Sequence, residues 1–266
     1  MKKLIKGLQE FQTRYYSSHK DLFEQLSQGQ HPRVLFIACS DSRVDPNLIT
    51  NTEPGELFVI RNAGNIIPPY EATDGGEGAA VEYAIHALDI QQIIVCGHSH
   101  CGAMKGLLKL NSLEEEMPLV YEWLKHAEAT RRLIKDHYGD HEGEDLLDAT
   151  IAENVLTQIE NLRTHPVIHS KLYSGQLSIH GWIYYIETGQ VLAYDAEQHQ
   201  FLPPSSQIDL SRKEVQSPAK LTQKQLRIAR GTSSTAPEDP LVEAPSNSSS
   251  WLSPEQANRI YRGSSV

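Results

Sequence analysis

Two short runs of the sequence combine residue types that bind metal ions. Cys39 opens Cys-Ser-Asp-Ser-Arg after the apolar run 34–38, and His98 and Cys101 bound His-Ser-His-Cys after the apolar run 93–96. Both runs are typical of buried strands, and in an open α/β sheet ligands collect beyond the carboxyl ends of the strands. Two thiolates and one imidazole suit zinc and leave one tetrahedral position open. The pattern therefore predicts a catalytic site with one Zn²⁺ per chain.

Core packing is the main alternative for Cys39, because a cysteine that closes a strand is often only buried. His98 and Cys101 argue against it, since their spacing after a strand turns both side chains toward one crevice. A structural zinc site would need a fourth protein ligand. Cys96 lies inside an apolar run, and His100 stands between two ligands and is expected to point away. An open site is therefore favoured.

Asp41 and Arg43 lie two and four residues beyond Cys39, close enough to act beside a metal ion. A carboxylate at this place can orient the nucleophile, and a guanidinium that binds it through two hydrogen bonds keeps it ionised. An ordinary surface ion pair is the alternative. The position next to a metal ligand favours a catalytic role for both residues.

Length and composition indicate one large domain with an extension at each end. The chain has 266 residues, and half of its 14 prolines lie beyond residue 200. The segment 206–266 is rich in Ser, Thr, Pro, Gln and Asn and has too few apolar residues to offset its ordering entropy. We therefore expect an amino-terminal helical arm at 1–30, a zinc domain at 31–205 and a low-complexity tail at 206–266.

The order of elements in residues 31–205 predicts an α/β fold. The apolar runs 34–38, 57–60 and 93–96 indicate parallel strands, and the segment 76–88 has the apolar spacing of a helix between two of them. Further helices are expected at 118–133, at 145–162 and from Gly102 onward. Alternation in 176–186 and a turn at 188–189 predict a hairpin with 190–194. The expected fold is a mostly parallel sheet flanked by helices, with an antiparallel edge strand.

Charge and hydropathy exclude several kinds of partner. The net charge is −10 and no Lys/Arg cluster is large enough to follow a phosphate backbone, so no nucleic-acid partner is expected. No apolar run approaches the roughly 18 residues of a membrane span. Three cysteines and no signal peptide indicate a reducing compartment. We expect a cytoplasmic protein with no membrane partner.

The two motifs and their surroundings resemble the β-class carbonic anhydrases over about residues 1–205. The agreement extends to Gln30, to the run 54–65 that contains Arg-Asn-Ala-Gly-Asn, and to Glu-Tyr-Ala at 82–84. The resemblance implies a zinc lyase that hydrates CO2 to bicarbonate. It also implies a substrate pocket with Gln30 donating to a bicarbonate oxygen and with these further residues: Phe58, Ala63, Tyr83 and the backbone of Gly102. Plant-type members commonly have Val in place of Ala63.

The resemblance also bears on the state of the site. In some bacterial members the counterpart of Asp41 binds zinc, and a Trp lies three residues before the first cysteine. Here that position is Phe36, which has no indole N–H, so we expect an open site with Asp41 paired to Arg43. Two alternatives are a CS2 or COS hydrolase of the same fold and an inactive zinc-stabilised scaffold. Intact Asp41, Arg43 and Gln30 argue against the scaffold.

Apolar residues in the arm recur at helical spacing and include Leu4, Leu8 and Phe11. The arm either packs on its own domain or, as the resemblance implies, covers a partner in a homodimer or a higher oligomer of dimers.

The tail most resembles that of the cyanobacterial carboxysomal members. Within it, segment 251–263 has helix-capping residues at Ser253, Pro254 and Gln256. We expect this segment to bind a carboxysome scaffold or shell protein, which would place the enzyme where it supplies CO2 to Rubisco. The alternative is that it folds back on the catalytic domain.

Overall fold

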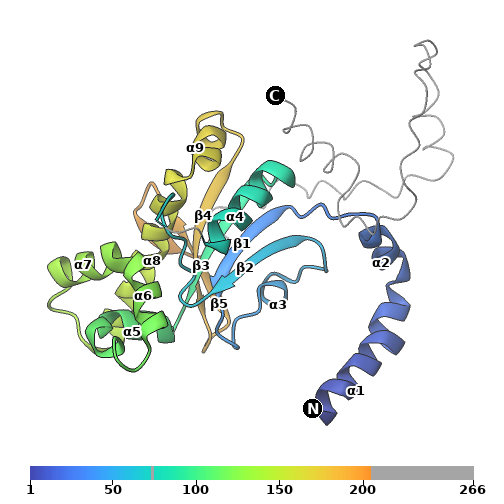
Figure 1. The fold of residues 1–266 in the computed structure, drawn as a ribbon, viewed down its shortest axis with the longest axis horizontal. Helices are drawn as coiled ribbons and strands as arrows, with labels where there is room; N and C mark the ends of the chain where they lie inside the picture. The colour runs from blue at the N-terminus through green and yellow to red at the C-terminus, as the bar shows by residue number, and fades with distance from the viewer. Residues whose placement is uncertain (73–74, 205–266) are drawn as a thin grey trace. The chain divides into compact units, whose positions relative to one another are not determined.

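The computed structural model describes residues 1–72 and 75–204, and these residues build a six-stranded sheet in the order β2-β1-β3-β4-β5-β6 (Figure 1). The first four strands in this order are parallel, and β5 and β6 are antiparallel to their neighbours. The predicted mostly parallel sheet with an antiparallel edge is confirmed, and β6 is an additional short strand. The bounds are β1 Val34–Cys39, β2 Leu57–Asn62, β3 Gln92–His98, β4 Ser178–Tyr185, β5 Gln190–Asp195 and β6 Gln200–Leu202.

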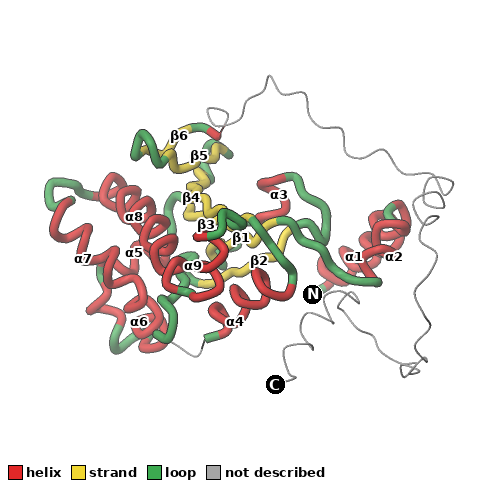
Figure 2. Tube along the Cα trace, turned by 90° about the horizontal axis from the view of Figure 1, so that it is seen from above, coloured by secondary structure: helices red, strands yellow, loops and turns green. Residues whose placement is uncertain are grey.

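Alternation along β1 divides the apolar residues between two faces of the sheet. Leu35 and Ile37 belong to the large core, which includes residues of α4 Gly76–Glu82, α5 Gly102–Leu108, α8 Gly143–Thr164 and α9 Pro166–Tyr173. Phe36 and Ala38 belong to a smaller cluster that includes Ile49 of α3 Pro46–Thr50. Figure 2 shows α4 and α9 on one side of the strands and α3 on the other. Among the described residues, few therefore cover the face opposite the large core.

Two glycines bring α8 into direct contact with the sheet. A Cβ atom on Gly97 of β3 would lie 2.9 Å from Val155 Cγ2, and one on Gly181 of β4 would lie 2.9 Å from Val155 Cγ1. Any larger side chain at these positions would lift the helix away from the strands. The 22 residues of α8 thus run closely along the strands that end at the candidate site.

The helices between β3 and β4 differ from the prediction in their limits. The predicted helix 118–133 is divided into α6 Pro118–Leu124 and α7 Glu128–His137 by a 3-10 turn at Lys125–Ala127. Another 3-10 turn, Leu110–Leu113, precedes them, and a π-helical turn, Tyr83–Ala87, follows α4. The Tyr138 hydroxyl donates to Glu153 of α8 and so links the end of α7 to that helix. None of the described helices is long and apolar enough to cross a membrane.

The arm consists of α1 Lys2–Glu10, a π-helical turn Phe11–Tyr16 and α2 Lys20–Ser27. Its helical nature is confirmed, but no residue of these three elements is buried. Leu4 is 64% exposed and Leu8 is 69% exposed. The described residues thus leave the apolar face of α1 exposed, and the expectation that the arm covers a partner stays a prediction. The tail beyond residue 204, with segment 251–263, lies outside the described residues.

Candidate active site

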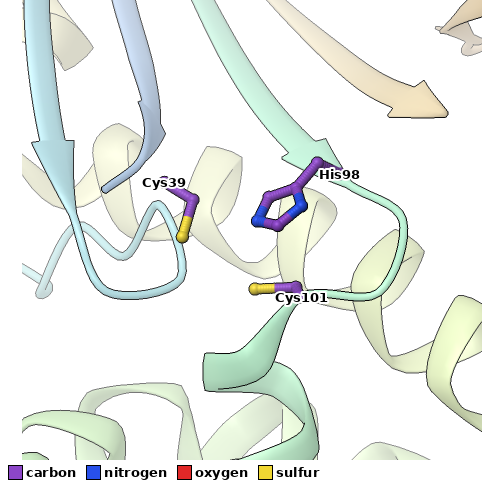
Figure 3. A group of neighbouring side chains, drawn as sticks. All are labelled: Cys39, His98 and Cys101. Carbon is purple, nitrogen blue, oxygen red and sulfur yellow. The ribbon is translucent and has the colours of Figure 1, made fainter. Parts of the chain in front are cut away.

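Three side chains from separate elements converge at the carboxyl end of the parallel strands (Figure 3). Cys39 is the last residue of β1, His98 is the last residue of β3, and Cys101 directly precedes α5. Their ligand atoms lie within 4.8 Å of one another, and all three residues are buried. In the part of the chain that the structure describes, this is the one group of His, Cys, Asp and Glu residues able to hold a metal ion. We call it the metal group.

The His98 ring is fixed in the orientation that a metal ligand needs. Its Nδ1–H donates to the Ser99 carbonyl at 2.9 Å, so Nε2 carries the free lone pair. His98 is fully buried, yet Nε2 has no hydrogen-bond partner among the described residues. Buried polar atoms nearly always have a partner. An unsatisfied imidazole nitrogen facing two thiols therefore fits a metal ion.

The thiols of Cys39 and Cys101 differ in their pKa. The hydrogen bond from Cys101 lowers the pKa of the Cys39 thiol, which favours its thiolate form. The same bond raises the pKa of Cys101. Burial raises the pKa of Cys96 to about 12, which agrees with its expected place in the core. A metal ion binds the deprotonated thiol, and the hydrogen bond from Cys101 favours that form at Cys39.

Asp41 and Arg43 form a two-point ion pair beside the metal group. Arg43 Nε donates to Asp41 Oδ1 at 2.9 Å and Arg43 Nη2 donates to Oδ2 at 2.7 Å. These bonds hold the pKa of the Asp41 carboxyl well below its usual range. Asp41 Oδ2 lies 4.0 Å from His98 Nε2, and Arg43 Nη2 also reaches the His100 carbonyl at 3.4 Å. The pair thus lies at the metal group and joins the two sequence motifs.

His100 is turned away from the metal group, as the sequence suggested. Its backbone has φ of +55°, and its ring nitrogens lie 3.8 Å from Glu144 and 3.6 Å from Glu187. The left-handed backbone at His100 allows the chain to turn between His98 and Cys101.

Two further residues fix the backbone around Cys39, and the sequence assigns neither of them a role. Arg61 Nε donates to the Cys39 carbonyl at 3.0 Å, and its Nη2 donates to the Asp41 carbonyl at 2.7 Å. Asn154 of α8 donates to the Gly64 carbonyl at 3.0 Å. The role of Arg61 depends on the pairing of β1 with β2, and Asn154 is 90 residues from its partner Gly64. Local sequence spacing therefore predicts neither contact.

The expected substrate-pocket residues fall into two places. Gly102 follows Cys101 at the start of α5, and Ala63 precedes Gly64, whose N–H donates to Cys39 Sγ at 3.4 Å. Both therefore lie at the metal group.

Gln30, Phe58 and Tyr83 lie elsewhere in the chain, and we call them the β2 cluster. Phe58 pairs with Leu35, which lies four residues before Cys39. The Cα of Phe58 is therefore roughly 13 Å from the level of Cys39, measured along the strand direction. The Phe58 and Tyr83 ring centroids are 6.0 Å apart, and the Tyr83 hydroxyl interacts with Gln30. One chain thus keeps the β2 cluster together but does not bring it to its own metal group.

Comparison with known proteins gives consistent results. A family model described as carbonic anhydrase matches residues 34–191. A carbonic anhydrase of Synechocystis sp. is 60% identical, and the alignment covers 99% of this chain and 100% of the relative. The solved structure of the β-carbonic anhydrase CcaA is 70% identical, has a TM-score of 0.76, and is matched over 77% of this chain and 99% of that one. A structure from a study of two tetrameric β-carbonic anhydrases of Sordaria macrospora is 26% identical, with a TM-score of 0.64 over 71% of this chain and 94% of that one.

Proposed function

The chain belongs to the β-class carbonic anhydrases, and we propose that it hydrates CO2 to bicarbonate with one zinc ion held by Cys39, His98 and Cys101. The observation that carries the zinc assignment is the buried Nε2 of His98, which has no partner among the described residues and faces the two cysteines. Two sulfur ligands and one nitrogen ligand leave one position for the reactants. When bound, zinc lowers the pKa of a water molecule and so supplies a nucleophile near neutral pH.

Asp41 and Arg43 act beside the metal in this proposal. Asp41 is held ionised by Arg43, so its carboxylate accepts a hydrogen bond and directs the nucleophile toward carbon. Two zinc-bound thiolates donate more charge than two imidazoles would, which makes the metal a weaker Lewis acid than in an all-histidine site. Orientation of the nucleophile by Asp41 therefore contributes a larger share of the rate enhancement than it would in an all-histidine site.

The substrate pocket is completed by a second copy of the chain. The Cα of Phe58, which belongs to the β2 cluster, lies roughly 13 Å along the strand from the level of Cys39 in its own chain, and β2 is an edge strand among the described strands. The exposed apolar face of the arm also calls for a partner. Assembly as a dimer or an oligomer of dimers would place Gln30, Phe58 and Tyr83 of one protomer beside Ala63 and Gly102 of the other. The tetrameric relatives of Sordaria macrospora are consistent with such an assembly.

The tail gives the enzyme its location. The match to the Synechocystis relative covers nearly the whole chain and thus includes the tail, whereas the CcaA structure matches 77% of it. We assign segment 251–263 to binding a scaffold or shell protein of the carboxysome, where the enzyme would supply CO2 to Rubisco. Deleting residues 247–266 should leave CO2 hydration nearly intact and abolish recruitment to the assembly. Loss of hydration with recruitment preserved would show that the segment serves the catalytic domain.

The test of the reaction and its metal is a parallel assay of the purified full chain. Zinc content is measured with the rates of CO2 hydration and of COS and CS2 hydrolysis on the same sample. The proposal predicts one zinc per chain and CO2 as the preferred substrate. Faster turnover of COS or CS2 would instead make the chain a hydrolase of the same fold, and absence of zinc in an active enzyme would overturn the metal assignment.

A further inference from the structure

One peptide group connects a tryptophan of α6 to the sulfur of Cys39. The indole Nε1–H of Trp123 donates to the Ala63 carbonyl at 2.8 Å. The N–H of Gly64 donates to Cys39 Sγ at 3.4 Å. The Ala63 carbonyl and the Gly64 N–H belong to the same planar peptide unit. Trp123 therefore binds one end of an amide whose other end binds the sulfur.

This peptide has little freedom to turn. Gly64 has φ of +85°, and a Cβ there would lie 2.8 Å from Met104 Cε, so α5 packs against it closely. On the carboxyl side of Gly64, Asn154 holds the next carbonyl at 3.0 Å. Trp123 is itself packed against the large core, with its ring 5.6 Å from that of His126. The indole is thus a fixed donor to a fixed acceptor.

A donor at the carbonyl end strengthens the bond at the N–H end. Hydrogen bonds in a chain polarise one another, and the effect is larger where water is excluded. A hydrogen bond to a thiolate withdraws charge from sulfur, and such bonds to ligand sulfurs tune the metal that the sulfur binds. A stronger N–H···S bond makes Cys39 a weaker electron donor and the metal a stronger Lewis acid.

We propose that Trp123 is a positioning residue that tunes the Cys39 thiolate through the Ala63–Gly64 peptide. The inference rests on the proposed zinc site and adds a residue to it that lies 84 positions from Cys39 in the sequence. Trp123 is not a member of the metal group and acts through this peptide. Removing its N–H should weaken the N–H···S bond, raise charge donation from sulfur and reduce the Lewis acidity of the metal.

The test uses full-length protein loaded with cobalt(II), whose sulfur-to-metal charge-transfer bands report the donor strength of the thiolates. Trp123→Phe keeps an aromatic ring and removes the N–H. The bands should move to lower energy at an unchanged cobalt content of one per chain, and kcat of the zinc enzyme should fall several-fold with KM nearly constant, since one indirect hydrogen bond is lost. The control is Trp182→Phe, because the Trp182 ring packs against Phe36 on the other face of the sheet. The charge-transfer bands of cobalt-loaded Trp182→Phe should not move.

Unchanged bands in a folded Trp123→Phe protein would overturn the proposal. So would loss of cobalt without a band shift, since it would show that Trp123 only packs the loop. If Trp123→Phe does not fold, tryptophan is replaced by benzothienylalanine in the Trp182→Phe, Trp251→Phe background. This analogue has sulfur in place of N–H and keeps the ring shape, and the same shift is expected. Failure of the unmodified chain to show thiolate bands would contradict the zinc site itself, which separates the two results.

Discussion

At the scale of single residues, the two motifs account for the metal group but not for what supports it. The spacing of Cys39, His98 and Cys101 predicts their meeting because parallel strands end at one edge of a sheet. Trp123 and Asn154 support the neighbouring loop from distant helices. These contacts depend on how α6 and α8 pack, so they cannot be predicted from residue types and local spacing.

Replacement of Arg43 by Lys should separate orientation from metal binding. Lysine keeps the positive charge but cannot form both hydrogen bonds that Arg43 donates to Asp41. We expect zinc content to stay at one per chain and kcat to fall about 10- to 100-fold. Metal analysis and stopped-flow CO2 hydration measure the two effects.

Arg132→Lys is the matched control, because Arg132 pairs with Asp136 on the exposed surface of α7. Its rate should equal that of the unmodified enzyme. An Arg43→Lys enzyme with full kcat would show that the ion pair does not orient the reactants.

At the scale of elements, the periodicity of apolar residues predicts most of the strands and helices. The residues at which they begin and end depend on local contacts. The predicted helix 118–133 is interrupted at Lys125–Ala127, where the chain tightens into a 3-10 turn before α7. The strand β6 has only three residues, too few to show alternation. Its pairing with β5 depends on the tertiary fold and cannot be predicted from the sequence pattern.

The contact of α8 with the sheet predicts a large cost for a small substitution. Gly181→Ala would place a methyl group 2.9 Å from Val155 Cγ1 and 3.2 Å from Ile159 Cδ1. Overpacking of this kind should lower the free energy of unfolding by about 1–3 kcal/mol. Urea denaturation measures the change. Gly139→Ala is the control, since a Cβ there meets nothing within 4 Å, and an equal effect of both substitutions would refute the close contact.

The link between α7 and α8 predicts a pH dependence at high pH. The hydrogen bond to Glu153 raises the pKa of Tyr138 to about 12 in the folded protein, whereas a tyrosine in the unfolded chain titrates near 10. Because the folded-state pKa is raised, the stabilisation is complete below about pH 10 and is lost as the pH rises toward 12. Tyr138→Phe should cost about 1 kcal/mol at pH 8 and progressively less between pH 10 and 12. A cost that stays constant across this window would contradict the assignment.

At the scale of the whole molecule, the residues proposed to form the active site lie at two separate places of the described chain. The metal group lies at the end of β1 and β3, whereas Phe58 of the β2 cluster pairs with Leu35, four residues before Cys39. The arm has no buried residue in its helices. The sequence predicts the members of both places but not their separation, because pocket residues inferred from a resemblance carry no information on which copy supplies them.

Complementation between two inactive variants tests this arrangement. A Cys39→Ala chain keeps the β2 cluster, and a Gln30→Leu chain keeps the metal group. If one copy completes the site of the other, mixed dimers regain one intact site, and a randomly reassociated equimolar mixture should reach about a quarter of the unmodified activity. A mixture no more active than its two components would place the whole site within one chain.

The proposed zinc site at the three converging side chains is tested most directly by adding zinc stepwise to the metal-free full chain and following CO2 hydration. Activity should rise in proportion to zinc and stop rising at one ion per chain. The Cys101→Ala protein should stay inactive and retain well below one zinc per chain, since it keeps two of the three ligands. Full zinc occupancy and normal activity of Cys101→Ala, or full activity of the chain before any zinc is added, would contradict the account.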